Sequence, residues 1–335
     1  MKGMQLQQAA PIEKAPMRAV ELQVPAPEPG HVRVHVTACG ICRTDLHVIE
    51  GELPERCLPI IPGHQIVGRV DAVGDGVVDF REGERVGVAW LRHTCGSCRF
   101  CQTDRENLCE QASFTGYDAD GGFAEYAQVP APFAYRIPDD FDDVSAAPLL
   151  CGGIIGYRAL TRAHVPSKGR LALFGFGSSA HVVLQIARHR GYRVFVVSRG
   201  AEHRQLARKM GAEWVGDNAA ELPEKTDSAI VFAPAGELVP AALESIDKGG
   251  TVALAGIYMS DVPALDYEKH LFYEKRLQSV TSNTRTDGRA LLIEAAAAGV
   301  RPHVTTYPLH EANRALQDLK SDRINGSGVL TIARS

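Results

Sequence analysis

The chain has 335 residues, of which 45% are hydrophobic and 23% charged, the balance of a globular protein with about two domains. The net charge of −4 argues against nucleic acid or an anionic membrane as a partner, because no excess of positive charge attracts phosphate. No apolar run approaches the roughly 20 residues that cross a bilayer, and the N-terminal segment lacks the apolar core of a signal peptide. We therefore expect a cytoplasmic protein whose fold begins near Met17, after a ragged lead-in.

The first part of the chain is predicted to be mostly β-strand and loop. In the segment 31–40, Val32, Val34 and Val36 alternate with other residues, which predicts a strand with one buried face. The segment 69–90 shows similar alternation around Asp-Gly and Glu-Gly turns.

A run of four cysteines follows this β-rich part. Cys95, Cys98, Cys101 and Cys109 have the spacing C-x2-C-x2-C-x7-C. Short loops let successive thiolates converge on one tetrahedral ion, so the run predicts a structural zinc site with no open position. Two disulfides in a secreted protein are the alternative. They fit poorly, because the chain has only eight cysteines and half of them lie in this window.

From about residue 151 to residue 280, predicted strands alternate with predicted helices. Strands are expected at 171–175, 193–198, 229–234 and 251–256, and helices at 178–191, 201–212 and 237–250. This alternation predicts a doubly wound parallel sheet with helices on both faces. A helix near 290–299 and a strand near 328–332 follow, so the α/β segment is expected to be inserted between two parts of the β-rich domain.

A glycine-rich turn joins the first of these strands to the first helix. Gly175, Gly177 and Ala180 form the pattern G-x-G-x-x-A in the strand–turn–helix context of a dinucleotide-binding loop. The glycines let a pyrophosphate approach the backbone, and the helix that begins at Ser178 offers amide donors and a positive dipole end. An ordinary strand–helix turn is the alternative.

The end of the second strand of this segment bears on the choice between NAD and NADP. Sites for NAD usually have Asp or Glu there, which binds the ribose 2′-hydroxyl. This chain has Ser198 and Arg199, so no carboxylate repels a 2′-phosphate and a guanidinium is available to pair with one. We predict binding of NADP, or of both cofactors. The alternative is that Arg199 only faces solvent.

Residues that bind metals also occur in three other segments. ACGICRTDLH contains Cys39, Cys42 and His47, IPGHQIVG contains His64, and PLLCGG contains Cys151. Two thiolates and one imidazole would form a zinc site whose fourth position is open to water or substrate. The segments are far apart, so their spacing does not establish a site, and a lone His or Cys is more often a packing or surface residue.

The chain resembles the zinc-dependent alcohol dehydrogenases of the medium-chain dehydrogenase/reductase superfamily over nearly its whole length. The resemblance rests on GICRTDLH, IPGHQIVGRV, the four-cysteine run, GGFAEY at 121–126, PLLCGG and GFGSSA, in this order. It implies a GroES-like catalytic domain at 1–152 and 285–335, with the cysteine lobe at 95–109, and a Rossmann domain at 153–284. It also implies two zinc ions per chain, NAD(P) as cofactor, and a homodimer or homotetramer.

The resemblance assigns the catalytic zinc to one set of ligands. Cys42, His64 and Cys151 match the family's ligands, whereas Cys39 does not. Asp45 matches a carboxylate that orients the zinc-bound histidine.

Further roles follow from the same motifs. Thr44 matches the hydroxyl that contacts the substrate oxygen, and His47 matches the histidine that passes the proton towards solvent. Arg43 and Arg285 match contacts to the cofactor pyrophosphate, and Trp90 matches an aromatic wall of the substrate pocket.

Two positions depart from the family pattern. Gln65 follows the zinc-binding histidine where the family usually has glutamate, and Ile155 stands where many relatives have threonine near the cofactor. A neutral amide offers neither the negative charge nor the alternative ligand of a glutamate, which puts the family's ligand-exchange route in doubt. Ile155 cannot make the hydrogen bond of a threonine.

The predicted function is the reversible oxidation of primary or secondary alcohols by hydride transfer to NAD(P), with NADP favoured. One alternative is an NADPH-preferring aldehyde reductase of the cinnamyl alcohol dehydrogenase type, which Ser198 and Arg199 favour. A polyol dehydrogenase fits the four-cysteine lobe and Trp90 less well. A non-enzymatic zinc-binding relative is the alternative from another class, but it would need neither the candidate ligands nor Thr44 and His47.

Overall fold

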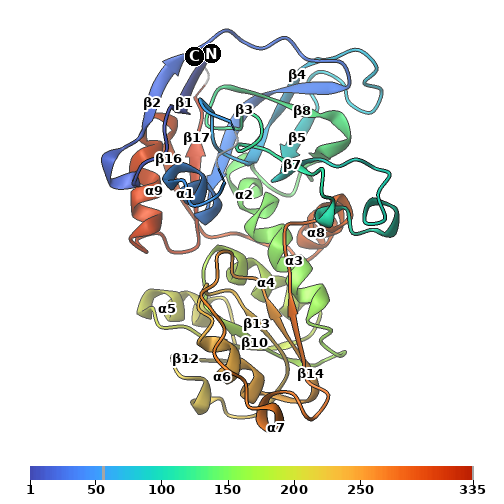
Figure 1. Ribbon diagram of the computed structural model, residues 1–335, viewed down its shortest axis with the longest axis vertical. Helices are drawn as coiled ribbons and strands as arrows, with labels where there is room; N and C mark the ends of the chain where they lie inside the picture. Colours follow the sequence, from blue (N-terminus) through green and yellow to red (C-terminus); the bar gives the residue numbers. More distant parts are fainter. Residues whose placement is uncertain (55–56, 334–335) are drawn as a thin grey trace. The chain divides into compact units, whose positions relative to one another are not determined.

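The computed structural model describes residues 1–54 and 57–333, which fall into two compact units. Unit 1 contains Met1–Cys151, Ser282–Ala296 and Pro302–Ser335, and unit 2 contains Gly152–Thr281 and Ala297–Arg301. Unit 1 is β-rich, and unit 2 alternates strands with helices (Figure 1). The predicted α/β fold class is therefore confirmed.

Unit 1 is built on a seven-stranded sheet whose central strand is β3 (His31–Ile41). This strand pairs antiparallel with three others, and Val32, Val34 and Val36 on its inner face are fully buried, as their alternation predicts. The strand order is β16-β17-β3-β4-β5-β9, with β8 also paired to β3. The other strands are β4 (Gln65–Val73), β5 (Arg85–Val88), β8 (Tyr126–Pro130), β9 (Ala134–Arg136), β16 (Val304–Pro308) and β17 (Ser327–Thr331).

The N-terminal residues belong to this unit, so the expectation of a ragged lead-in before Met17 is wrong. Strand β1 (Lys2–Leu6) pairs antiparallel with β2 (Met17–Glu21). Met4 is 4% exposed, and Leu6 and Ile12 are fully buried. Strand β1 is only 5 residues long. The sequence of so short a strand does not separate it from a tail, and its pairing with β2 decides its structure.

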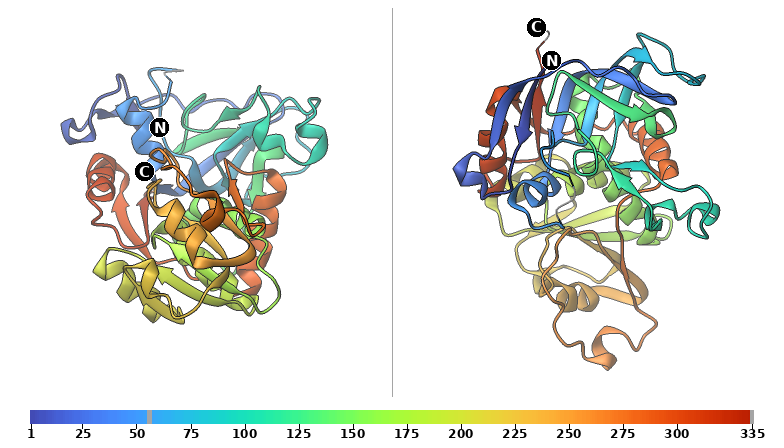
Figure 2. Two further views of the ribbon diagram at one scale, coloured as in Figure 1. Left: turned by 60° about the horizontal axis from the view of Figure 1, so that its bottom comes forward. Right: turned by 45° about the horizontal axis from the view of Figure 1, so that its top comes forward.

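Among the described residues of unit 1, four α-helices lie wholly or mainly in this unit: α1 (Arg43–Glu50), α2 (Asp143–Ala146), α8 (Arg285–Ala297) and α9 (Ala312–Lys320). Helix α9 lies against α1, β16 and β17 (Figures 1 and 2). Helix α8 begins before the predicted position 290, because Thr284 and Asp287 form reciprocal side-chain to backbone hydrogen bonds at its first turn. The cysteine-rich segment connects the short antiparallel strands β6 (Leu91–His93) and β7 (Ser113–Phe114).

Unit 2 contains a six-stranded parallel sheet of order β12-β11-β10-β13-β14-β15. The strand order reverses between β10 and β13, and right-handed crossovers in opposite directions from this point place helices on both faces. Its strands are β10 (Arg170–Phe174), β11 (Arg193–Val197), β12 (Trp214–Gly216), β13 (Thr226–Val231), β14 (Ile246–Leu254) and β15 (Arg276–Ser279). Its helices are α3 (Gly152–Arg162), α4 (Ser178–His189), α5 (Ala201–Lys209), α6 (Leu238–Ser245) and α7 (Tyr267–His270).

The helix predicted at 237–250 is shorter in the structure. Helix α6 ends at Ser245, and β14 begins at Ile246. Gly249 has a φ of 73°, and two adjacent glycines weaken a helix, so the segment after Ser245 joins the sheet instead.

No single helix among residues 1–54 and 57–333 is long and apolar enough to cross a membrane. The segments Asp143–Leu150 and Gly152–Arg162 satisfy the length and composition test only as a pair, and they are bent by 48° with respect to each other.

Candidate active site

The structure brings Cys42, His64 and Cys151 together in unit 1, although they are far apart in the sequence. Their ligand atoms lie within 4.8 Å of one another. The Sγ atom of Cys42 is 3.4 Å from Nε2 of His64 and 3.8 Å from Sγ of Cys151. In a tetrahedral zinc site, two sulfur ligands would be about 3.8 Å apart, and a sulfur and a nitrogen about 3.5 Å apart. The three residues therefore fit zinc, with one coordination position left for another molecule.

The orientation of the His64 ring is set by Asp45. Nδ1 of His64 lies 3.1 Å from Oδ1 of Asp45, and both residues are almost completely buried. The second carboxylate oxygen of Asp45 accepts a hydrogen bond of 2.8 Å from the backbone N–H of Cys42. Asp45 thus braces two of the candidate ligands and directs Nε2 of His64 towards Cys42, as carboxylates do for metal-binding histidines.

The protonation of this cluster also fits a bound cation. The hydrogen bond with Cys151 and burial raise the pKa of the Cys42 thiol well above its usual range. Burial by itself would lower the pKa of His64, but the charges of Asp45 and Cys42 raise it to about 10. Protons therefore occupy the positions that a metal would take, and metal binding displaces them.

The backbone before His64 is held by close contacts that only glycine permits. Gly63 has a φ of 96°, and a Cβ atom there would lie 2.4 Å from Cδ1 of Phe123. A Cβ atom on Gly121 would lie 2.0 Å from the carbonyl oxygen of Gly63. The backbone N–H of Gly122 donates to that same oxygen at 2.8 Å. The GGFAEY segment therefore locks the turn that presents His64.

Thr44 and His47 both lie on α1, where each is less than a tenth exposed. Nδ1 of His47 hydrogen-bonds to the carboxylate of Glu52, whose side chain is 39% exposed. The end of the helix creates this pair. Gly51 has a φ of 75°, and the N–H of Glu52 donates to the carbonyl of His47 at 2.9 Å, so the chain turns back over the helix. Glu52 was missed at the sequence level, because only this turn places it against His47.

Trp90 lies beside His64, one of the three candidate zinc ligands, and belongs to a stack of aromatic rings. Its ring meets His64 edge-on, with centroids 5.0 Å apart. It stacks on Phe114 at 4.8 Å and on Tyr117 at 5.8 Å. The Tyr117 hydroxyl donates to the carbonyl of Pro54. Trp90 therefore packs against two aromatic neighbours, and the wall next to His64 is apolar.

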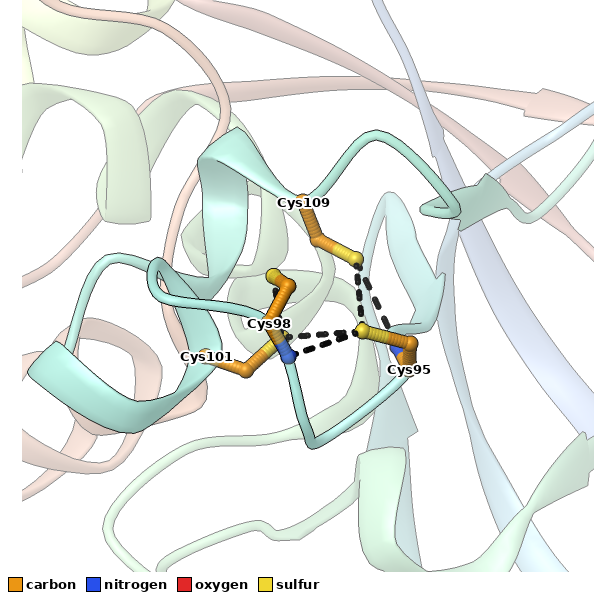
Figure 3. A group of neighbouring side chains, drawn as sticks. All are labelled: Cys95, Cys98, Cys101 and Cys109. Carbon is orange, nitrogen blue, oxygen red and sulfur yellow. Dashed lines mark hydrogen bonds between the residues drawn. The ribbon is translucent and has the colours of Figure 1, made fainter.

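The four cysteines of the lobe also converge, as Figure 3 shows. Three sulfur–sulfur distances are 3.5 Å between Cys98 and Cys101, 3.6 Å between Cys95 and Cys109, and 3.9 Å between Cys95 and Cys101. These distances are close to the value of about 3.8 Å expected between two sulfur ligands of one zinc ion. They are far longer than the S–S bond of a disulfide. All four cysteines are free thiols, so the arrangement fits a structural zinc ion rather than two disulfides.

Backbone amides already stabilise negative charge in this lobe. The N–H groups of Ser97 and Cys98 lower the pKa of Cys95 to about 6. Burial and the hydrogen bond with Cys98 raise the pKa of Cys101 to about 11. A thiolate supported by turn amides is the form that binds zinc, so the turn around Gly96 is prepared for a metal.

Arg285 anchors the lobe to the start of helix α8. Its guanidinium makes hydrogen bonds of 2.7 to 3.1 Å with both carboxylate oxygens of Glu106, which lies between Cys101 and Cys109. The guanidinium also lies 4.5 Å from the centre of the Phe133 ring. The resemblance implies that Arg285 contacts the cofactor pyrophosphate, and that role stays a prediction. In the structure, the carboxylate of Glu106 pairs with Nε and Nη2 of Arg285.

For three other positions named in the sequence analysis, the structure gives the location and the degree of burial. Arg43 is exposed at the start of α1, and Ile155 is half-buried in α3. Gln65 is 1% exposed, and its Nε2 has no hydrogen-bond partner in the described part of the chain.

The glycine-rich turn in unit 2 joins β10 to α4. Gly175 has a φ of 87°, and a Cβ atom there would approach the backbone nitrogen of Ala233 to 3.0 Å. Gly177 precedes the first residue of α4, Ser178, and a Cβ atom on Gly177 would meet nothing within 4 Å. The turn therefore combines a conformation that favours glycine with open space at the start of a 12-residue helix, as a pyrophosphate site requires.

Ser198 and Arg199 follow strand β11 at the same end of the parallel sheet. Ser198 is 6% exposed, and its N–H donates to the carbonyl of Gly216, at the end of β12, at 2.9 Å. Arg199 is exposed. The carboxyl ends of parallel strands form the ligand-binding edge of such a sheet, so both residues lie at that edge.

Two regions of the chain match known protein families. Residues 28–139 match the family described as the alcohol dehydrogenase GroES-like domain. Residues 180–298 match the family described as zinc-binding dehydrogenase. The first match contains Cys42, His64 and the cysteine lobe, and the second contains most of unit 2.

Individual proteins are similar over almost the full chain. A probable alcohol dehydrogenase, AdhA, of Mycobacterium tuberculosis is 49% identical, covering 99% of this chain and 97% of the relative. An alcohol dehydrogenase of Geobacillus stearothermophilus is 35% identical, covering 95% of this chain and 96% of its own length. Among solved structures, a cinnamyl alcohol dehydrogenase of Sorghum bicolor is 27% identical with a TM-score of 0.88, covering 98% of this chain and 97% of that one.

Proposed function

Because the chain belongs to the zinc-type alcohol dehydrogenases of the medium-chain dehydrogenase/reductase superfamily, we propose that it interconverts alcohols and aldehydes or ketones with NAD(P), using zinc at Cys42, His64 and Cys151. The observation that carries this proposal is the convergence of two thiols and one imidazole within 4.8 Å. Asp45 behind His64 is the support that such a ligand needs. A non-enzymatic scaffold has no use for this arrangement.

The proposed chemistry divides between the bound groups and the chain. When bound, zinc supplies a Lewis acid that favours loss of the alcohol proton, and the nicotinamide supplies the hydride acceptor. Thr44 is proposed to accept a hydrogen bond from the alcohol hydroxyl, and His47 to take the released proton onwards. The stack of Trp90, Phe114 and Tyr117 keeps one wall beside His64 apolar and limits the bulk of the alcohol.

Glu52 extends the proton path to solvent in this proposal. Its carboxylate bonds Nδ1 of His47, so the ring is held as the Nδ1–H tautomer with Nε2 as the proton acceptor. The 39% exposure of Glu52 gives the proton of His47 access to water.

Glu52→Gln is expected to lower kcat for alcohol oxidation about tenfold, because it removes the carboxylate that orients the His47 ring and passes its proton to water. Added imidazole in the assay is expected to restore part of the rate, since a soluble base can replace a lost proton acceptor. Glu311→Gln, which disrupts an exposed ion pair with Arg314, is the matched control. It should change neither kcat nor the response to added imidazole. An unchanged kcat in Glu52→Gln would exclude the proton-path role.

A cinnamyl-type aldehyde reductase that prefers NADPH is the second candidate. Ser198 in place of an acidic residue and the exposed cation of Arg199 favour NADP over NAD. The apolar ring stack beside His64 is compatible with an aromatic substrate, and the Sorghum bicolor relative is a cinnamyl alcohol dehydrogenase. The ratio of kcat/KM for benzyl or cinnamyl alcohol to that for ethanol separates the candidates.

The experiment that tests the proposal measures zinc per chain together with alcohol-dependent reduction of NAD and NADP. We expect two zinc ions and turnover with both cofactors, with NADP the better substrate. One zinc ion and no turnover with any alcohol would show that only the cysteine lobe binds metal, and it would refute the enzyme proposal. The expected cytoplasmic location is part of the same proposal, because both clusters need reduced thiols.

We also infer that the chain forms a homo-oligomer. Large exposed hydrophobic side chains gather in the segment 257–273 of unit 2: Ile257, Tyr258, Val262, Tyr267, Phe272 and Tyr273. Tyr267, Phe272 and Tyr273 contact one another, and an exposed aromatic cluster of this kind is typical of a protein–protein contact. Light scattering coupled to size-exclusion chromatography should therefore give two or four times the chain mass of 36.2 kDa, and a monomer would contradict the inference.

A further inference from the structure

A charge pair lies at the ligand-binding edge of the sheet in unit 2, next to the predicted ribose site. Arg204 belongs to helix α5, and Asp217 directly follows strand β12. Their side chains approach to 3.4 Å. Because the N–H of Ser198 donates to the carbonyl of Gly216, the neighbour of Asp217, the carboxylate stands beside the end of β11, where an NAD site usually carries its own acidic residue.

The Arg204 side chain is held by the loop that follows β11. Its Nη1 donates to the carbonyl of Ser198 at 2.8 Å and to the carbonyl of Arg199 at 2.6 Å. The side chain is only 20% exposed, so it is fixed rather than free in solvent. By contrast, the Arg199 side chain is exposed. Arg204 is therefore the better organised of the two cations at this position.

The geometry leaves donors of Arg204 available to a ligand. A guanidinium has five N–H donors in a planar fork, and the hydrogen bonds described for Arg204 use only Nη1. Nη2 and Nε retain their donors, which are the pair that binds phosphate oxygens in a bidentate manner. Asp217 is 58% exposed and can turn away from the guanidinium at little cost, because an exposed ion pair is weak.

We propose that Arg204 binds the 2′-phosphate of NADP, and that Asp217 is the counter-charge that holds Arg204 when the 2′-position is a hydroxyl, as in NAD. The pair then makes one site compatible with both cofactors. Asp217 contacts Nη1 of Arg204 and leaves Nη2 and Nε to the phosphate. Its negative charge repels the phosphate, so Asp217 reduces the preference for NADP without abolishing it. The inference rests on the proposed function in so far as the ligand is an adenine dinucleotide.

The test measures binding rather than turnover. Adenosine 2′,5′-diphosphate and 5′-AMP differ only in the 2′-phosphate, so the ratio of their dissociation constants, measured by isothermal titration calorimetry, isolates that group. Asp217→Asn is expected to increase the preference for the diphosphate about three- to tenfold, by removing a negative charge that repels the 2′-phosphate. Arg204→Gln is expected to reduce the preference by about tenfold or more, and Arg204→Lys to retain part of it.

Arg208→Gln is the matched control. Arg208 lies one turn further along α5 and donates to the carbonyl of Val215 at 3.1 Å, so it shares the helix and the strand but not the ribose position. We expect it to leave the binding ratio unchanged. Melting temperatures of all variants show whether the fold survives. If Arg204→Gln does not fold, Asp217→Asn still decides the question, because an exposed carboxylate is replaced by its isostere.

An unchanged ratio in Asp217→Asn would overturn the inference, as would an equal change in Arg208→Gln. Binding of neither nucleotide by the unmodified chain would contradict the dinucleotide site, and with it both the inference and the proposed function. A shifted ratio in a protein that oxidises no alcohol would support the inference and contradict only the proposed enzyme activity. The two conclusions can therefore fail separately.

Discussion

Cys42→Ser is expected to lower alcohol turnover by about a thousandfold or more, because the loss of a zinc ligand removes a Lewis acid worth several kcal/mol of transition-state stabilisation. The zinc content should fall by one ion per chain. The fold should persist, since Cys42 forms the N-terminal boundary of α1 and the packing of β3 and β4 around it does not depend on a metal. Turnover, zinc content and the circular dichroism spectrum measure these outcomes.

Cys57→Ser is the matched control for this variant. Cys57 is an exposed free thiol that belongs to neither cysteine cluster, so its replacement should change neither zinc content nor activity. Full activity in Cys42→Ser would exclude Cys42 as a ligand of the catalytic metal. The same zinc content as in the unmodified chain would also argue against it.

Cys98→Ser is expected to destabilise the protein, in contrast to Cys42→Ser. The lobe between β6 and β7 contains only short 3-10 turns, so its structure depends on the metal and on the pairing of Glu106 with Arg285. Loss of one thiolate is expected to cost about 3 kcal/mol or more of folding free energy and to lower the melting temperature by about 5–10 °C. Differential scanning calorimetry measures this change, with Cys57→Ser again as the control.

The two cysteine variants together separate the proposed sites. Each should lose one zinc ion, but only Cys42→Ser should lose activity while keeping its melting temperature. A Cys98→Ser protein that melts like the unmodified chain would show that the lobe holds itself together without metal. If both variants lost stability equally, the division into a catalytic and a structural site would be wrong.

The fold was largely predictable because its signals are local. The alternating valines of β3, and the strand–helix alternation around Gly175 and Gly177, each lie within one or two elements, so short windows of sequence contain the pattern. The predictions failed where local signals were weak. Strand β1 is too short to show a period, and the segment after Ser245 carries helix-like apolar spacing but two glycines that favour the strand.

The site was predictable in its residue types but not in all its partners. Cys42 and His64 are 22 residues apart, and Cys42 and Cys151 are 109 apart, so no spacing rule connects them and only the motifs of a known family made them candidates. Glu52 and Glu106 carry no motif of their own. From the sequence, a glutamate that faces solvent cannot be distinguished from one that pairs with His47 or Arg285.

The sequence by itself determined the chemistry that the chain has available: clustered thiols at 95–109, a glycine-rich turn for a pyrophosphate, and no carboxylate at Ser198. These follow from residue type and short spacing, which the covalent chain fixes. The tertiary structure decided which distant groups meet: Asp45 with His64, Glu52 with His47, and Asp217 with Arg204. Such contacts depend on the path of the whole chain. That path is set by the burial of apolar surface within the core of each unit and not by any one segment.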